Sequence, residues 1–423
     1  MELKKYKIGD LVQVTRGASL GGEFYATQGN YVRLTCGNFD YRNNCFKENQ
    51  SKDNIYYTGG FKEEFLLEKG DIITPLTEQA IGLLGSTARI PESGKYIQSQ
   101  DIAKIDCNES LLDKDFAFYL ISSACVKQQL SAAAQQTKIR HTSPDKIKEC
   151  TVWIPSLDVQ KRIGRILTDI DNKIAINRQI NDNLEAMAKQ LYDYWFVQFD
   201  FPNEEGKPYK SSGGAMVYNE KLKREIPKGW HCGTLLDIAE YTNGLACQKY
   251  RPIDNNKLPV IKIKEMHDGL SADTEWIRAD IPDDVKVFDG DVLFSWSASL
   301  EVILWAYGNG GLNQHIFKVT SKNGYPRSFY FYQLIHYVGV FKQMAEARKT
   351  TMGHITQDHL RQSTIALPPN VDIANKLEEK LCPIFDEIVK NNQEIMALTK
   401  QRDELLPLLM NGQASVNYHL SDD

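Results

Sequence analysis

The chain has 423 residues, of which 42% are hydrophobic and 25% charged, with a formal net charge of −5 at pH 7. This ordinary globular composition and this length predict two or more domains. The first ten residues, MELKKYKIGD, lack the apolar core of a signal peptide, and the most apolar window, Val292 to Tyr307, is too short to span a bilayer. We therefore expect a cytoplasmic protein.

Cysteine spacing and charge exclude some kinds of site. No two of the eight cysteines form a C-x-x-C pair, so neither a zinc ribbon nor a redox motif is visible. The acidic excess falls in residues 369–423, and the larger blocks before them are near neutral. Composition alone therefore gives nucleic-acid binding no support, although a near-neutral block can still carry a basic face.

Two large blocks of the sequence repeat one plan. Leu11–Gly17 and Ile238–Gly244 are β-like runs that end in a glycine and a polar loop, and a strand is predicted after each, at Tyr31–Thr35 and Val260–Lys264. Repetition of this kind indicates two copies of one domain.

The repeat continues through two further strands in each block. Lys69–Ile73 matches Asp289–Leu293 as a Gly-Asp turn that enters a strand, because glycine supplies the positive φ and aspartate caps the turn. After a further loop, Gln100–Ile105 matches Gln314–Val319.

Each block then ends in a helix and a proline-marked strand. Helices are predicted over Asp115–Ala134 and Pro326–Ala347. After them, residues 141–155 align with residues 354–368 at a constant offset of 213. A long helix follows each proline.

The two long helices carry matching seams. From Ile163 the seam positions recur at alternating steps of four and three, the spacing of a coiled coil, and residues 160–196 would make a rod of roughly 55 Å. The seam recurs 214 residues later, with Asn391 in the place of Asn177. The seam positions are Ile163, Leu167, Ile170, Ile174, Asn177, Leu184, Leu191, Leu377, Leu381, Ile384, Ile388, Asn391, Leu398 and Leu405.

We expect the two helices to pair with each other as an antiparallel intramolecular coiled coil, because sustained seams of this spacing usually find a partner helix. A polar residue in the seam costs stability but fixes register. The alternative is two amphipathic helices packed on separate cores. Pro383, inside the second helix, is expected to kink or restart it.

The predicted fold is mixed α/β (α+β), with two similar domains, each followed by a long helix, and pseudo-two-fold symmetry. The segment between the copies is rich in Gly, Ser, Lys and Glu and is expected to be a surface linker. The expected parts are a first domain at 1–155, a first long helix at 156–201, a linker at 202–232, a second domain at 233–368, a second long helix at 369–412 and a tail at 413–423.

This plan suggests DNA as a partner. Two-fold DNA-binding dimers read two half-sites at a separation that the protein sets. Two unlike blocks in one chain could read two unlike half-sites, and the tether would give the second block a high effective concentration once the first is bound.

The chain also resembles a known family, on LYDYWFVQFDFP, on GKPYKSSGGAM with REIPKGW, and on RDELLPLLMNGQASV. It is similar over its whole length to the specificity subunits of type I restriction–modification systems. The resemblance implies two target recognition domains, spacer helices that act as a ruler, and no catalytic activity. It implies two methylase subunits that use S-adenosylmethionine on adenine. It also implies two restriction subunits that complete an ATP-dependent endonuclease with magnesium.

Catalytic motifs are absent from the sequence. No P-loop exists, and the string nearest to a methylase element is Leu367-Pro-Pro-Asn370. Gly308–Gly311 is expected to be a plain turn, and the carboxylate strings Pro282–Lys286 and Glu378–Lys380 are better explained as solvated charges. His354 and His359 are five residues apart and do not make a metal pair on a helix. We predict no catalytic residue, no metal and no cofactor in this chain.

Basic and polar residues in equivalent loops of the two copies are the candidate DNA contacts. Arg could bind guanine through two donors, whereas Lys would mostly meet phosphate. Lys262 and Lys264 are expected on one strand. For each residue a solvated surface charge is the alternative, and the two histidines could instead be buried residues that hold the helix entry. The candidates are Arg16, Ser19, Lys138, Arg140, His141, Lys249, Arg251, Lys262, Lys264, Lys349, Thr351 and His354.

The aromatic end of the first long helix has two interpretations. Tyr192, Trp195 and Phe196 could pack the helix end onto the second block, or they could form part of a methylase docking surface, since aromatic residues are enriched at interfaces. Packing is the favoured interpretation.

The sequence therefore predicts a DNA-recognition subunit that reads a bipartite target and leaves methylation and restriction to its partners. Two other classes compete. One is an enzyme that modifies DNA alone, which the absent motifs argue against. The other is a scaffold that does not bind DNA and is built from a repeated domain and a coiled coil, which salt-sensitive, sequence-selective duplex binding would exclude.

Overall fold

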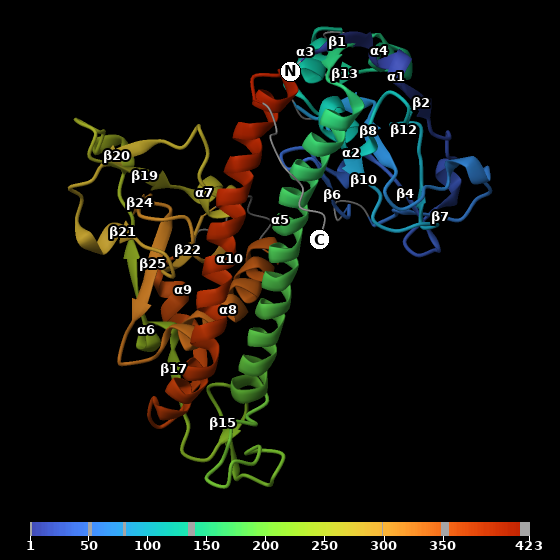
Figure 1. Cartoon of the computed structure of the whole chain (residues 1–423). Helices are drawn as coiled ribbons and strands as arrows, with labels where there is room; N and C mark the ends of the chain where they lie inside the picture. Colours follow the sequence, from blue (N-terminus) through green and yellow to red (C-terminus); the bar gives the residue numbers. More distant parts are fainter. Residues whose placement is uncertain are drawn as a thin grey trace. The chain divides into compact units, whose positions relative to one another are not determined.

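The computed structural model describes residues 2–49, 53–78, 82–133, 140–297, 299–347 and 355–414. The chain forms two units, one of Met1–Asn172 with Leu398–Asp423 and one of Lys173–Ala397 (Figure 1). The division falls within both long helices, so each unit contains one domain and part of each helix.

The first unit is built on an antiparallel four-stranded sheet in the order β10-β8-β12-β2. Val12 and Val14 point into the core while Gln13 is exposed, the alternation of a half-buried strand. A smaller sheet, β11-β4-β7-β3, has a hydrophobic core of its own. The strands are β2 (Val12–Arg16), β8 (Ile72–Pro75), β10 (Ala88–Arg89), β12 (Ile102–Cys107), β3 (Tyr25–Ala26), β4 (Tyr31–Arg33), β7 (Tyr56–Tyr57) and β11 (Tyr96–Ile97).

Short elements complete the first unit. β1 (Lys4–Lys7) pairs with β14 (Thr151–Ile154), while α1 (Ile8–Leu11) and α4 (Pro144–Glu149) lie against each other. The helix predicted over 115–134 is two helices, α2 (Lys114–Ile121) and α3 (Ala124–Ala133). At this break the Ser122 hydroxyl donates to the Phe118 carbonyl at 3.1 Å.

The second unit repeats the main sheet. Its order, β18-β25-β22-β23, reproduces β2-β12-β8-β10 strand for strand. In the smaller sheet β19 pairs in parallel with β24, as β4 does with β11. The predicted repeat is therefore confirmed. The strands are β18 (Ala239–Asn243), β22 (Val292–Ser295), β23 (Glu301–Leu304), β25 (Ile316–Ser321), β19 (Lys257–Ile261), β20 (Trp276–Arg278), β21 (Lys286–Val287), β24 (Gly310–Leu312), and β17 (His231–Thr234), which pairs with β26 (Thr364–Leu367).

Four helices lie among these strands. Three of them are short, and α8 is the counterpart of α2 and α3 in the first unit. They are α6 (Leu235–Ile238), α7 (Ile263–Asp268), α8 (Arg327–Ala347) and α9 (Gln357–Gln362).

The matched Gly-Asp turns hold equivalent ion pairs. Lys104 Nζ lies 3.2 Å from the Asp71 carboxylate, and Lys318 Nζ lies 2.9 Å from that of Asp291. The glycine before each aspartate has a φ of 84°, which only glycine adopts readily. The predicted turns thus position an aspartate whose ion pair with a lysine links β8 to β12 in one unit and β22 to β25 in the other.

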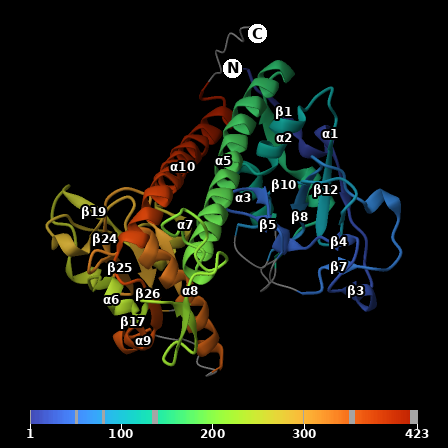
Figure 2. The same cartoon turned by 90° about the horizontal axis from the view of Figure 1, so that it is seen from below.

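The long helices α5 (Leu157–Tyr192) and α10 (Asp372–Met410) run antiparallel. Within the second unit, Asn177 Nδ2 donates to Glu394 (2.8 Å) and Asn181 Nδ2 donates to Asn392 (2.9 Å). Asn391 Nδ2 donates to Asn181 (2.9 Å). Across these contacts the residue numbers on α10 fall as those on α5 rise, as in an antiparallel pair. Figure 2 shows the two helices side by side. The predicted pairing is confirmed.

The seam positions differ in how deeply they are buried. Phe385, 1% exposed, lies deeper than its neighbour Ile384, because α10 also packs against Phe331 and Tyr332 of α8. The buried seam residues are Ile163, Leu167, Ile174, Asn177, Leu377, Leu381, Ile388 and Asn391. The half-buried ones are Ile170, Leu184, Leu191, Ile384, Leu398 and Leu405.

The helix α10 continues through Pro383, so the predicted restart is wrong. Leu381 and Phe385, on either side of the proline, are both fully buried and hold the helix in place. Proline removes the hydrogen bond to the carbonyl of Glu379, which is exposed and can bind water instead.

The segment between the copies has a defined fold. β15 (Met216–Asn219) and β16 (Arg224–Pro227) form a hairpin, and Phe201 stacks between Tyr209 and Trp230 at ring distances of 4.8 and 5.3 Å. The expected surface linker is thus packed onto the second unit. Among the helices of the described residues, none is long and apolar enough to cross a membrane.

Candidate nucleic-acid interface

Candidate DNA contacts of the first unit gather at one end of its main sheet. Arg16 ends β2 with an exposed side chain, and its Nε donates to the Gln100 carbonyl at 2.7 Å. The next residue, Gly17, lies so close to the following loop that a Cβ there would come within 2.3 Å of the Gln98 carbonyl oxygen. Ser19 lies just beyond and is exposed.

A third and a fourth segment reach the same end. Leu76, after β8, donates its backbone N–H to the Asp101 carbonyl at 2.7 Å and accepts from Thr142 at 2.9 Å. We call Arg16, Leu76, Gln100 and Asp101 the first rim.

Arg140 and His141 lie next to the first rim in β13 (Arg140–His141), which pairs with β9 (Thr77–Glu78). The Arg140 guanidinium donates to Ser131 at 3.1 Å and lies 3.6 Å from the buried Glu78 carboxylate. His141 is exposed. The structure thus brings Arg16, Arg140 and His141 to one end of the sheet, as the sequence suggested.

The equivalent end of the second unit carries uncharged polar and aromatic side chains. Trp296 Nε1 donates to Asn243 Oδ1 at 3.1 Å, and the Trp296 and His315 rings are 5.7 Å apart. Gln314 Nε2 lies 3.3 Å from the His315 ring nitrogen. We call Asn243, Trp296, Gln314 and His315 the second rim. None of these residues is among the candidates predicted from the sequence, although Asn243 and Trp296 stand at the ends of repeated strands.

The basic candidates of the second copy lie elsewhere. Lys249 and Arg251 are exposed on the loop after β18. Lys262 and Lys264 are not on a strand, because β19 ends at Ile261 and both belong to the start of α7.

A carboxylate explains why the strand ends there. The Lys262 backbone N–H donates to the side chain of Glu265 at 3.1 Å, which caps α7. The Lys262 ammonium is 2.5 Å from Glu275, and that of Lys264 is 3.8 Å from Asp273. Both cations are therefore paired with acids, and both are weak candidates for phosphate contacts. The other candidates, Lys138, Lys349, Thr351 and His354, lie outside the described residues.

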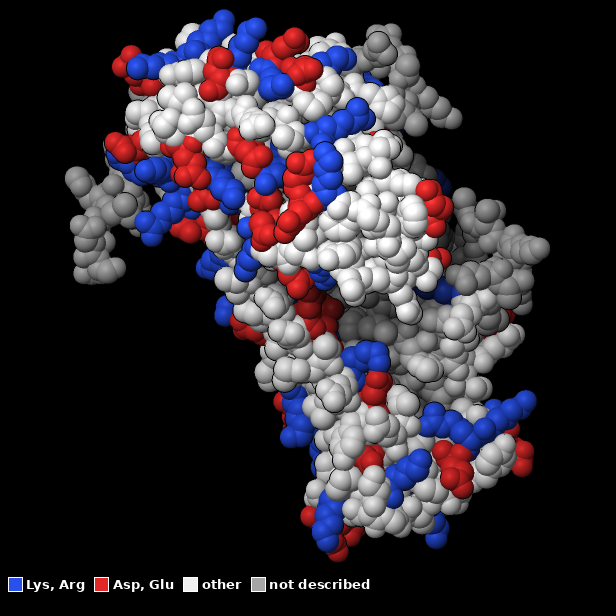
Figure 3. Space-filling view, turned by 90° about the vertical axis from the view of Figure 1, so that its right-hand side faces the viewer, with Lys and Arg blue, Asp and Glu red and all other residues white. Residues whose placement is uncertain are grey.

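The surface charges are mixed. Figure 3 shows Lys and Arg side chains interspersed with Asp and Glu over one face of the molecule. This agrees with the near-neutral composition of both blocks. The side-chain chemistry at the rims is therefore a better guide to DNA contacts than the electrostatic potential of the whole surface.

The aromatic candidates for partner docking are buried. Tyr192, Trp195 and Phe196 are each 3 to 4% exposed in the core of the second unit. Tyr192 stacks on Tyr332 at 5.0 Å, and Phe196 meets Phe329 at 4.8 Å. These three side chains pack the helix end, and they offer no surface to a partner.

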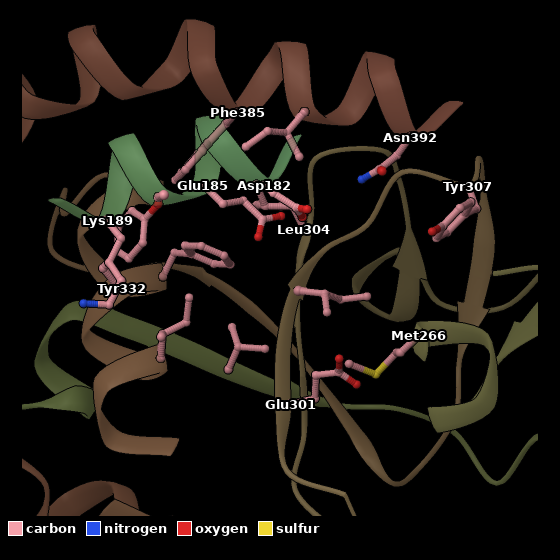
Figure 4. Close-up of a pocket in the computed structure, with 16 residues that line it drawn as sticks. Asp182, Glu185, Lys189, Met266, Glu301, Leu304, Tyr307, Tyr332, Phe385 and Asn392 are labelled. Carbon is pink, nitrogen blue, oxygen red and sulfur yellow. The ribbon is translucent and has the colours of Figure 1, made fainter. Parts of the chain in front are cut away.

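A cavity of about 580 Å³ lies within the second unit between α5, α8, α10 and β23 (Figure 4). Its walls combine apolar side chains with the carboxylates of Asp182, Glu185 and Glu301. Burial raises the pKa of Glu185, and the charge of Asp182 adds to the effect. Lys189 also lines the cavity, but carboxylates predominate and disfavour phosphate, so we do not assign this cavity as a DNA site. Among the described residues, no group of three or more His, Cys, Asp or Glu is placed to hold a metal ion.

The chain matches a known family model and curated relatives over most of its length. Residues 1–186 and 227–400 match the sequence model of the type I restriction modification DNA specificity domain. The type I restriction enzyme MjaIX specificity subunit of Methanocaldococcus jannaschii is 26% identical over 351 residues, which cover 79% of this chain and 78% of the relative. The HindI specificity subunit of Haemophilus influenzae is 22% identical over 471 residues, which cover 97% of this chain and 99% of the relative.

A solved structure agrees in fold. The S subunit of a type I restriction–modification system from M. genitalium superposes with a TM-score of 0.60 at 14% identity and covers 97% of this chain and 96% of its own. The family match spans both domains and most of both long helices. The chain belongs to the type I restriction–modification DNA specificity subunits, which recognise DNA and are not themselves catalytic.

Proposed function

We propose that each domain of this chain reads one half of a split DNA target, and that the chain directs two methylase subunits and two restriction subunits to that target. The observation that carries this proposal is the repeated domain with unlike side chains at equivalent rims. Two copies of one fold with different surface chemistry suit two different half-sites.

The residues proposed to contact DNA in the first domain are Arg16, Ser19, Arg140 and His141. Arg16 and Arg140 carry donors that can reach base edges or phosphates. In the second domain we propose Lys249 and Arg251 as phosphate contacts, since both are exposed on a loop. Lys262 and Lys264 rank below them because acids neutralise both.

The chemistry belongs to the partners. The methylases would supply S-adenosylmethionine for adenine modification, and the restriction subunits would supply ATP and magnesium chemistry. We propose that the complex acts in the cytoplasm, where its DNA target would lie. The antiparallel helices would then act as a ruler that fixes the gap between the half-sites.

Methylation mapping tests the proposal. The chain is expressed with its methylase in a host whose DNA carries no adenine methylation, and modified adenines are located by sequencing. One split motif, methylated on both strands and lost when this chain is omitted, is the expected result. A soluble complex that methylates no defined motif would contradict it.

A further inference from the structure

The two rims share one backbone frame. Gly17 N–H donates to the Ile102 carbonyl at 3.2 Å, and Gly244 N–H donates to that of Ile316 at 3.1 Å. Each glycine lies against the backbone of the loop before the next strand, where a Cβ would clash at 2.3 Å. A parallel bridge follows each glycine, at Ala18 and at Leu245. The first position of each rim is therefore held by the same contacts.

The remaining rim positions are fixed in the same way. Leu76 N–H donates to the Asp101 carbonyl, and Trp296 N–H donates to the His315 carbonyl at 3.3 Å. Trp296 also accepts from Ile355 at 3.0 Å, as Leu76 accepts from Thr142. Leu76 and Asp101 of the first rim thus make the same backbone hydrogen bonds as Trp296 and His315 of the second rim.

This common frame carries unlike side chains at three of its four positions. The fourth position is glutamine in both rims, Gln100 and Gln314. The unlike pairs are Arg16 and Asn243, Leu76 and Trp296, and Asp101 and His315.

The unlike side chains have the chemistry of base recognition. Arg16, Asn243 and His315 are exposed, and Asp101 is half-buried. Arginine pairs with the O6 and N7 of guanine, asparagine with the N6 and N7 of adenine, and aspartate accepts from the N4 of cytosine. A half-exposed tryptophan such as Trp296 can stack on a base or pack on a thymine methyl group.

We propose that the two rims are the specificity-determining positions of the two domains, with Arg16 and Asp101 selecting bases in one half-site and Asn243 and His315 in the other. The inference deepens the proposed function and rests on it. It assigns base selection to Asp101, Asn243 and His315 in addition to the basic residues. The frame holds these side chains at one place in each domain, so their exchange changes the bases that are read without changing the fold.

The test transfers the chemistry of one rim to the other. The variant R16N/D101H gives the first rim the second rim's residues at two positions, and its motif is mapped in complex with the methylase. At one or more bases of the first half-site, preference should change by about tenfold or more. The second half-site and the gap should be unchanged, which shows that the complex is folded. The reciprocal variant N243R/H315D should alter only the second half-site.

A matched control is K62N. Lys62 is exposed in the same domain, lies outside the rim and pairs with Glu64 at 3.4 Å. The DNA motif methylated by the K62N complex should therefore equal the wild-type motif. An unchanged first half-site in R16N/D101H overturns the proposal, and so does a change in the other half-site. If the double variant loses all methylation, R16N and D101H are mapped singly, and two unchanged motifs overturn it. A wild-type complex without a split motif would instead contradict the proposed function.

Discussion

Arg402 and Asp171 form an ion pair between the two long helices, with Nη1 2.9 Å from Oδ1. Arg402 is 7% exposed, and the other Asp171 oxygen accepts from the Tyr119 hydroxyl at 2.7 Å. Both residues belong to the first unit, so this pair joins α10 to α5 and α5 to α2. Burial, together with the charge of Asp171, raises the pKa of Tyr119.

Replacing Arg402 tests how much this junction stabilises the subunit. R402M leaves the partly buried Asp171 carboxylate without the Arg402 guanidinium, so the free energy of unfolding should fall by about 2–3 kcal/mol. Denaturant unfolding measures it. K400M removes a charge whose side chain is 75% exposed on the same helix and should change stability by less than about 0.5 kcal/mol. Equal losses of unfolding free energy in R402M and K400M would show that the buried ion pair stabilises the subunit no more than an exposed charge does.

The asparagines of the seam should prove interdependent. N391L removes the donor to Asn181 Oδ1 in a buried layer and should cost about 1–2 kcal/mol. N181L/N391L replaces both partners by apolar groups and should recover most of that loss, because Asn392, which also loses its donor Asn181, is only half-buried and can bind water. The comparison is made by denaturant unfolding, with N183L, an exposed asparagine of α5, as the control. A double variant less stable than N391L would refute the coupling.

Helix length should set the gap in the DNA target. One heptad inserted in both α5 and α10 adds about 10 Å to each helix, which corresponds to about three base pairs of duplex. Methylation mapping of the lengthened subunit should return both half-sites unchanged and a longer gap. A motif with its original gap would show that the helices are not the ruler.

Asp200 predicts a pH dependence of stability. Ser211 donates both its hydroxyl and its backbone N–H to this carboxylate, which lowers the pKa of Asp200 below 3.8. A carboxyl whose folded pKa is depressed stabilises the protein above its unfolded pKa, and that contribution is lost as pH falls through the folded pKa. D200N should therefore be less stable than the wild type at pH 7, and the difference should shrink below pH 3.8.

The measurement is a thermal unfolding series of both proteins between neutral and acid pH. E204Q, which alters an exposed carboxyl in the same segment, serves as the control and should follow the wild type throughout. A difference between D200N and the wild type that stays constant with pH would show that Asp200 acts through packing alone.

The repeat and the helix pair could be predicted from the sequence because their signals are local. The matching of Asn177 with Asn391 marks the seam, and Gly70 and Gly290 mark equivalent turns, since each pattern depends on near neighbours in the chain. The predictions that failed depend on tertiary contacts. Pro383 stays helical because distant core residues hold both of its sides.

The candidate site was predictable only in part. Arg16 drew attention by its charge, whereas His315 lies at the rim only because β12 and β25 occupy equivalent places in two sheets. The alternation around Lys262 predicts a strand, because nothing in that run of residues reveals that Glu265 caps a helix there. Side chains that select bases are often uncharged, so composition does not mark them.

The core of the first unit includes Leu409 and Met410, from the last turn of α10. A ribosome makes the first domain early but makes these two residues only after the whole second domain. Until then Ile163 and Leu167, which belong to the same core, lack part of their cover. The core of the domain made first is thus completed only after the second domain has been made, and until then it is open to chaperones and to aggregation. Truncation of the C-terminal turn should therefore harm the domain at the opposite end of the sequence.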